Sequence, residues 1–178
     1  VHYGYDFDGN RIAKTVNGKK TEFFYDDSKL VYQKDAKTQM WFLYDADEEL
    51  AGFMLNGKSY YYKTNIWNDV TGIIDQTGKT VSSYEYDAWG RIISITGNKK
   101  LARMNPYRYR SYYYDAETGF YYLLNRYYDP QVGRMLNVDQ YISIAYPNQF
   151  TYAVNNPVMY GDASGNIVET LVDVASIG

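Results

Sequence analysis

The sequence predicts an all-β protein in which short hairpins join into one continuous antiparallel sheet. Three observations carry this prediction: Tyr-Asp dipeptides recur along the chain, two Asn-Gly pairs mark tight turns, and tyrosine is abundant. The 178 residues include 23 tyrosines, against 7 phenylalanines and 3 tryptophans. Tyrosine favours strands and suits half-buried sheet faces, because its ring is apolar and its hydroxyl is polar.

The Tyr-Asp pairs define an internal repeat, which is the signature of stacked supersecondary units. The pairs are Tyr5-Asp6, Tyr25-Asp26, Tyr44-Asp45, Tyr86-Asp87, Tyr114-Asp115 and Tyr128-Asp129. The first spacings are 20 and 19 residues, and the next, 42, spans two units with Tyr62-Lys63 in the vacant register. Because a unit of two short strands cannot bury a face alone, the units must stack into a continuous sheet.

Each Tyr-Asp pair is expected to end one strand and open a turn. The aspartate side chain can accept a hydrogen bond from the backbone two residues on, and a glycine about three residues later supplies a positive φ. The turn residues that fit this frame, with variants in the later repeats, are Asp6, Gly9 and Arg11; Asp87, Gly90 and Arg91; Asp115 and Gly119; and Asp129, Gly133 and Arg134.

The strands and further turns follow from the same frame. Alternating or aromatic runs predict strands at 11–16, 22–25, 40–44, 58–62, 81–86 and 91–96. The pairs Asn17-Gly18 and Asn56-Gly57 are typical two-residue hairpin turns, and residues 76–79 form another turn candidate.

The organisation of the chain changes near residue 105. Repeats are expected at 1–104, and a less regular, Tyr- and Arg-rich core segment at 105–166. Apolar residues at helical spacing in 167–178 predict a short C-terminal helix that begins a separate unit.

Composition excludes several classes of chemistry. The net charge of −3 shows no basic excess, which argues against a nucleic-acid partner, and no apolar run approaches membrane-spanning length, which argues against membrane insertion. With no cysteine and only His2, thiolate catalysis, disulfides, a Ser-His-Asp triad and a zinc site are excluded or nearly so. Acidic turns at 6–10 and 45–48 are better explained by turn chemistry than by calcium, so neither a metal nor a cofactor is expected.

A longer ordered string carries a family resemblance. Its segments are Asp87-Ala-Trp-Gly-Arg91, Asn105-Pro-Tyr-Arg-Tyr-Arg110, Tyr112-Tyr-Tyr-Asp115, Glu117-Thr-Gly-Phe-Tyr-Tyr122, Arg126-Tyr-Tyr-Asp-Pro130 and Gly133-Arg-Met-Leu136. This string closely resembles the repeat-associated core of Rhs proteins, and the Tyr-Asp frame with Tyr5, Arg11, Tyr86, Tyr114 and Tyr128 resembles their YD repeats.

The resemblance implies a spiralling β-sheet that forms a hollow shell around a C-terminal toxin, with the core segment plugging one end. Gly161-Asp-Ala-Ser-Gly165 resembles the junction to a variable toxin in wall-associated Gram-positive members. The expected partners are therefore a toxin domain and upstream repeats in the same polypeptide. A second copy is a further expected partner, because open sheet edges invite pairing. The expected location is secreted or wall-associated in a bacterium.

Two alternative functions stay open. Some family members cut themselves at the end of the core through two aspartates, which here correspond to Asp139 and Asp162, with cleavage after Asn166. Such chemistry needs two carboxylates that share a proton. The flanking prolines, the first glycine and the terminal leucine of that pattern are missing, and the rival interpretation makes both aspartates turn residues. The second alternative is a module that binds cell-wall sugars through exposed tyrosines.

The arginines among the tyrosines are conspicuous as well. Arg108, Arg110, Arg126 and Arg134 are expected to lie over tyrosine rings and to pair with acids such as Asp115, Glu117 and Asp129.

Overall fold

The computed structural model describes residues 1–138, 148–162, 165 and 169–170. The chain divides into two compact units. The first comprises Val1–Lys63 with Gly72–Val81, and the second comprises Thr64–Thr71 with Ser82–Gly178. In the described part of the chain, no helix is both long and apolar enough to cross a membrane.

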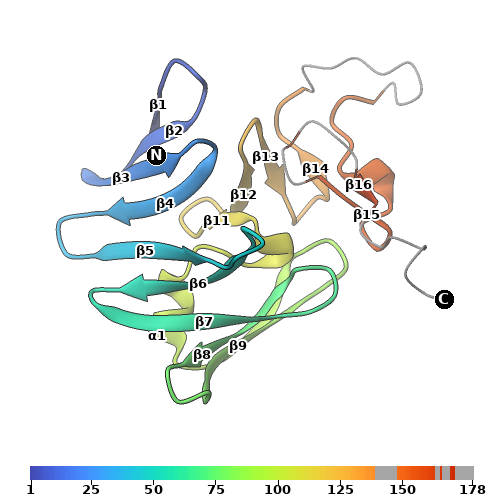
Figure 1. Cartoon of the computed structure of the whole chain (residues 1–178). Coiled ribbons are helices and arrows are strands. Elements are labelled where there is room, and N and C mark those ends of the chain that lie inside the picture. The colour runs from blue at the N-terminus through green and yellow to red at the C-terminus, as the bar shows by residue number, and fades with distance from the viewer. Residues whose placement is uncertain (139–147, 163–164, 166–168, 171–178) are drawn as a thin grey trace. The chain divides into compact units, whose positions relative to one another are not determined.

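A ten-stranded sheet in which every strand neighbours the next along the chain dominates the structure (Figure 1), which confirms the predicted fold class. Its strands are β1 (His2–Tyr5), β2 (Arg11–Val16), β3 (Lys19–Asp26), β4 (Lys29–Lys34), β5 (Gln39–Tyr44), β6 (Leu50–Leu55), β7 (Lys58–Thr64), β8 (Val70–Asp75), β9 (Thr80–Tyr86) and β10 (Ile92–Gly97). The two Asn-Gly turns form as predicted. Both residues of each turn have positive φ, at 50° and 77° in the first and 48° and 83° in the second.

The core of the first unit lies on one face of this sheet. Phe23, Met40, Phe42 and Phe53 are each at most 5% exposed. Burying a side chain of this size contributes about 1.5–3 kcal/mol. Arg11 is buried with them at 1% exposure, and its guanidinium lies 5.0 Å from the centre of the Phe23 ring.

The second unit departs from the hairpin pattern after β10. Asn98 caps α1 (Lys99–Met104), a helix that the sequence did not predict, by accepting a hydrogen bond from the Leu101 amide at 3.1 Å. A four-stranded sheet follows, with β11 (Tyr113–Asp115), β12 (Phe120–Leu123), β13 (Arg126–Asp129) and β14 (Arg134–Met135) in order. Two single-turn 3₁₀ segments lie at Tyr109–Ser111 and Ala153–Asn155.

The predicted C-terminal helix is wrong where the structure describes it. Glu169–Thr170 forms β16, which pairs antiparallel with β15 (Tyr160–Gly161). Strand pairing satisfies the same backbone groups that a helix would satisfy internally. The other residues of the predicted helix lie outside the described part of the chain.

In two Tyr-Asp pairs of the first unit, the tyrosine hydroxyl links one repeat to the one before it. The hydroxyl of Tyr25 donates to the Arg11 carbonyl at 3.1 Å, and that of Tyr44 donates to the Leu30 carbonyl at 3.0 Å. The strand register also shifts at these tyrosines, a bulge that re-aims the side chain and increases the local twist. Phenylalanine could fill the same space but could not make the bond.

Replacing Tyr44 with phenylalanine tests this link. We expect Tyr44→Phe to lower the free energy of unfolding by about 1 kcal/mol, because the Leu30 carbonyl loses its hydroxyl donor. Tyr61→Phe is the matched control, since Tyr61 lies 44% exposed in the same sheet. Urea unfolding followed by circular dichroism measures both. An equal effect of the two substitutions would contradict the link.

Candidate functional site

Three aspartate turns, two of them in Tyr-Asp pairs, share one hydrogen-bond pattern. In the turns that begin at Asp45, Asp75 and Asp87, one carboxylate oxygen accepts from the amides two and four residues on, at 2.9–3.2 Å. The residue three positions on has positive φ, which is glycine at two of these turns and Glu48 at the third. The predicted turn chemistry is therefore confirmed, although glycine is not obligatory.

Between the turns at Asp45 and Asp87, one repeat has no Tyr-Asp pair, and an asparagine takes the place of the aspartate. Asn65, and not Lys63, opens the turn after β7, and its Oδ1 accepts from the amides of Trp67 and Asp69, both at 3.0 Å. Lys63 is the penultimate residue of β7. The substitution works because an amide oxygen accepts these bonds as a carboxylate does.

The turn Asp87–Arg91 is held by buried tyrosines of the second unit. The hydroxyls of Tyr109, Tyr128 and Tyr121 donate to the carbonyls of residues 88, 89 and 90, at 2.8, 2.7 and 2.8 Å. Tyr121 and Tyr128 are 0% exposed and Tyr109 is 2% exposed. Three consecutive carbonyls thus have buried donors, which fixes the turn against the core segment.

Two glycines allow this close approach. A Cβ at Gly90 would lie 2.5 Å from the Tyr109 ring, and one at Gly133 would lie 2.8 Å from the Trp89 ring. Gly90 also has φ of 84°, a conformation that other residues adopt only at a cost. Of the four predicted motif glycines, Gly90 and Gly133 are therefore required by packing as well as by backbone conformation.

The remaining members of the cluster extend this polar network. Tyr152 donates to the Tyr112 hydroxyl at 3.3 Å, and the Asp162 amide donates to the same hydroxyl at 2.9 Å. Burial raises the pKa of the Tyr121 and Tyr152 phenols well above the ordinary value, and it raises that of Tyr84 to about 12.

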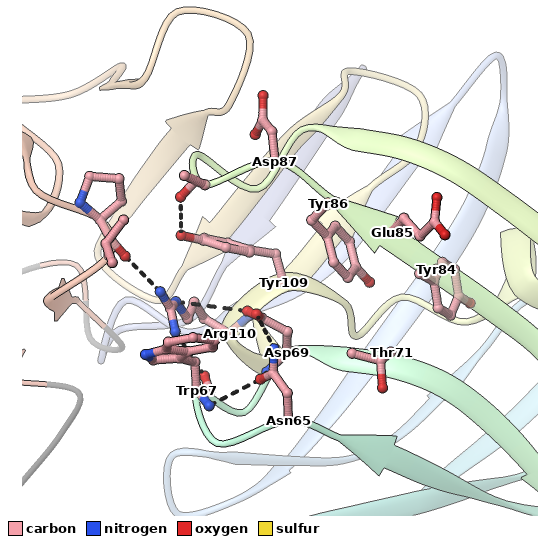
Figure 2. A pocket seen from close by; sticks show the side chains of 13 residues that line it. Asn65, Trp67, Asp69, Thr71, Tyr84, Glu85, Tyr86, Asp87, Tyr109 and Arg110 are labelled. Atoms are coloured by element: carbon pink, nitrogen blue, oxygen red, sulfur yellow. Dashed lines mark hydrogen bonds and ion pairs between the residues drawn. The ribbon is translucent and has the colours of Figure 1, made fainter.

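Arg110 is the centre of a second buried contact (Figure 2). Its Nη2 donates to the Pro157 carbonyl at 2.6 Å, its Nη1 donates to the Trp67 carbonyl at 3.3 Å, and its backbone amide donates to the Asp69 carboxylate at 2.9 Å. Its Nε lies 3.7 Å from Asp69 Oδ1, and its side chain is 6% exposed. One arginine thereby joins the turn that Asn65 opens, the core segment, and the chain near residue 157.

A pocket of about 430 Å³ lies beside this arginine. Figure 2 shows Trp67, Tyr86 and Tyr109 around the Asp69–Arg110 pair, with Thr71 to one side. The charged groups of the pair are already bound to each other, and the ring surfaces supply most of the remaining wall. Two other acids line the pocket and are engaged as well. Glu85 accepts from the Ser94 hydroxyl at 2.7 Å, and Asp87 Oδ2 lies 3.1 Å from Arg91 Nε.

Asp162 is held by a salt bridge to Arg126. Arg126 Nη2 donates to Asp162 Oδ2 at 2.8 Å, and these side chains are 5% and 1% exposed. Arg126 also donates to the carbonyls of Gln149, at 3.1 Å, and Gly165. Asp162 is therefore bound in a buried ion pair, while Asp139 and Asn166, its predicted partner and cleavage site, lie outside the described residues.

The arginine expectations are met in part. Arg108 lies over the Tyr114 ring, with its guanidinium carbon 4.3 Å from the ring centre, as predicted. The acids that pair with Arg110 and Arg126 are Asp69 and Asp162, which the sequence did not suggest. The turn at Asp129 has the expected side-chain bond, since its Oδ1 accepts from the Gln131 amide at 2.8 Å. At Asp115 and Asp129 the main-chain carbonyl also accepts, from the amides of Gly119 and Gly133 at 2.8 and 2.9 Å.

Consecutive hairpins followed in the chain by a buried tyrosine–arginine core define the class of protein: an all-β protein built from hairpin repeats. The Teneurin YD-shell family model matches residues 1–164, and the chain belongs to that family.

Curated relatives share this segment. The chain is 41% identical to the tRNA3(Ser)-specific nuclease WapA of Bacillus spizizenii over 96% of its own length, and it covers 8% of that relative. It is 25% identical to the double-stranded DNA deaminase toxin A of Burkholderia cenocepacia over 93% of its length, covering 14% of that protein. The chain thus spans a small fraction of the relatives that it matches.

Solved structures support the fold. The chain superposes on the crystal structure of TcdB2-TccC3-Cdc42 with a TM-score of 0.73 at 24% identity, covering 92% of this chain and 9% of the other. At that identity the similarity establishes the fold alone.

The raised pKa values of the buried tyrosines predict a loss of stability at high pH. Since folding raises the pKa of these phenols, the folded protein retains protons that the unfolded chain releases above about pH 10. The stabilisation is complete below about pH 10 and is lost as pH rises toward the folded pKa values, about 12 for Tyr84. Absorbance of tyrosinate at 295 nm should show a late, cooperative step that coincides with unfolding, and titration of all tyrosines near pH 10 in the folded protein would contradict this.

Proposed function

We propose that this chain is part of the wall of a toxin-enclosing shell in a secreted or cell-surface bacterial protein, and that its partner is a toxin domain in the same polypeptide. The family match over residues 1–164 carries the proposal. The sheet supports it, because consecutive hairpins continue one another without interruption and can extend as a wall.

The comparison with relatives favours a role for this segment in enclosing a toxin over a role in catalysis. One is named a tRNA nuclease and another a double-stranded DNA deaminase toxin, yet both share nearly the whole of this chain. A segment common to proteins with different activities is best explained as what they have in common, the delivery of a toxin. The match to a Bacillus protein supports a Gram-positive source.

The core segment is suited to close the wall. Its buried tyrosines and arginines bind main-chain carbonyls, at 2.6–3.3 Å in the bonds made by Tyr109, Tyr121, Tyr128 and Arg110. Such bonds fix irregular backbone without requiring another strand. We therefore assign residues 105–166 to the plug at one end of the shell.

Protease protection in the natural polypeptide that contains these residues tests the shell role. We expect the sequence that follows residue 178 to resist limited proteolysis, and Gly90→Ala to expose it, because the new Cβ collides with Tyr109. Gly78→Ala is the matched control: Gly78 has the same φ of 84° but nothing within 4 Å of the new Cβ.

One result would overturn the shell role, and another would exclude the tyrosine core from that role. One is digestion of the downstream sequence in the wild type as fast as in the same sequence expressed alone. The other is equal exposure by Gly90→Ala and Gly78→Ala, which would leave the tyrosine core without a part in enclosure.

Self-cleavage after Asn166 is the second candidate function. One observation supports it: Arg126 binds both the Asp162 carboxylate and the Gly165 carbonyl, and so fixes the peptide immediately before the predicted site. The catalytic hypothesis requires Asp139 to meet Asp162.

Intact mass separates cleavage from a purely structural role of the two aspartates. We expect self-cleavage to remove residues 167–178 from the wild type and to stop in both Asp162→Asn and Asp139→Asn. Since Asp162→Asn also breaks a buried ion pair, which costs about 3–5 kcal/mol, Asp139→Asn is the decisive variant. A wild-type chain that keeps its full mass would exclude self-cleavage after Asn166.

Sugar binding gains no support from Tyr32, a half-buried tyrosine of the first unit. Tyr32 stacks on Trp41 with ring centres 4.3 Å apart and packs on Phe24 at 5.4 Å. Its two ring faces are therefore occupied by neighbours, whereas a sugar would need a free face.

A further inference from the structure

The two ends of the hairpins in the first unit carry opposite charge. In an antiparallel meander, successive turns alternate between the two ends of the strands. Figure 1 shows the β4–β5 and β6–β7 connections at the same end of the sheet. The turns at this end carry lysines, which we call the lysine rim: Lys19, Lys20, Lys34, Lys37, Lys58 and Lys79.

The opposite end is acidic. Its acidic rim comprises Asp6, Asp8, Asp26, Asp27, Asp45, Asp47, Glu48 and Glu49. The basic residues in exposed positions there are Lys29, which is bonded to Glu48, and Lys63. The small net charge of the whole chain therefore conceals a strong separation along the strands.

The acids at the lysine rim are already engaged. Asp35 Oδ1 accepts from the amides of Lys37 and Thr38 at 2.7 and 2.8 Å. In the turn between β8 and β9, Asp75 Oδ1 accepts from the amides of Thr77 and Lys79 at 2.9 and 3.2 Å. Glu22 bonds to Lys20 at 2.9 Å.

Exposed, unpaired charges remain at both ends. Within the described part of the chain, the ammonium groups of Lys19 and Lys37 make no ion pair, and neither do the carboxylates of Asp26 and Asp47. Each rim therefore presents charge that a partner can neutralise.

The two rims also share one spacing. Each strand contributes one end to each rim, so the turns of both rims recur every second strand, about 10 Å apart. A lysine rim placed against an acidic rim can therefore match turn for turn along its length. A flexible polyanion could neutralise the lysines, but it would leave the acidic rim unexplained.

We propose that the lysine rim docks on the acidic rim of a second copy of this sheet, end to end. In a shell, the same contact would hold one winding of the spiral against the next. That extension rests on the proposed function, whereas the docking of two separate chains does not.

Self-association under controlled salt tests the docking. We expect sedimentation velocity to show association of the wild type at about 20 mM salt and at least a tenfold weaker association at about 500 mM, because salt screens exposed charges. Lys19→Glu/Lys37→Glu and Asp26→Lys/Asp47→Lys should each be monomeric alone, and an equimolar mixture should associate again.

A charge-matched control separates rim contact from net charge. Lys99→Glu/Lys100→Glu makes the same change in net charge on α1, in the second unit, and should associate like the wild type; circular dichroism confirms that every variant is folded.

Three results would overturn the docking. The first is a wild type that is monomeric at both salt concentrations, and the second is association that does not change with salt. The third is an α1 variant that loses association as much as the Lys19→Glu/Lys37→Glu variant. Salt-independent association would instead indicate pairing of open strand edges. Since no toxin is present, the outcome is independent of the protease-protection experiment, and failure of one can be told from failure of the other.

Discussion

The structure depends on one interaction: a tyrosine hydroxyl that donates to a main-chain carbonyl of an earlier segment. In the repeats, the hydroxyls of Tyr25 and Tyr44 donate to the carbonyls of Arg11 and Leu30, each on the strand immediately before. Each such bond removes an unsatisfied carbonyl from the bulged end of a strand, where the ladder is interrupted. The aromatic ring buries apolar area while its hydroxyl makes the bond, which explains why tyrosine so outnumbers phenylalanine in this chain.

In the core segment the same interaction is concentrated on one turn. Three tyrosine hydroxyls donate to the consecutive carbonyls of residues 88–90. The last turn of the regular repeats is therefore covered by the tyrosines of the core segment. A buried phenol without a partner would carry a desolvation cost of about 1–3 kcal/mol. Conversely, these satisfied phenols restrict the core to one arrangement. This packing requires glycine at position 90, because a Cβ there would collide with the Tyr109 ring.

Local rules explain what the sequence predicts well. The turns at Asp87 and Asn17-Gly18 follow from side-chain acceptors and positive φ within a few residues, and these were predicted correctly. The features that were not predicted depend on short elements or on contacts between residues far apart in the sequence. Helix α1 is too short for a periodic signal, and the Arg110–Asp69 contact joins residues 41 apart in the chain. An asparagine in place of the repeat aspartate concealed the turn at Asn65, although its acceptor chemistry is the same.

The end of the described chain shows why arginines accompany the tyrosines. Residues 148–162 contain one short strand and three consecutive left-handed residues, Ala153 to Asn155, each of which costs about 1–2 kcal/mol. A neighbouring strand cannot supply donors to backbone of this shape. Arg126 and Arg110 supply them instead, to the carbonyls of Gln149 and Pro157, since a guanidinium offers five donors in a rigid fork. Buried arginines thus let the chain leave the regular sheet without leaving these carbonyls unpaired.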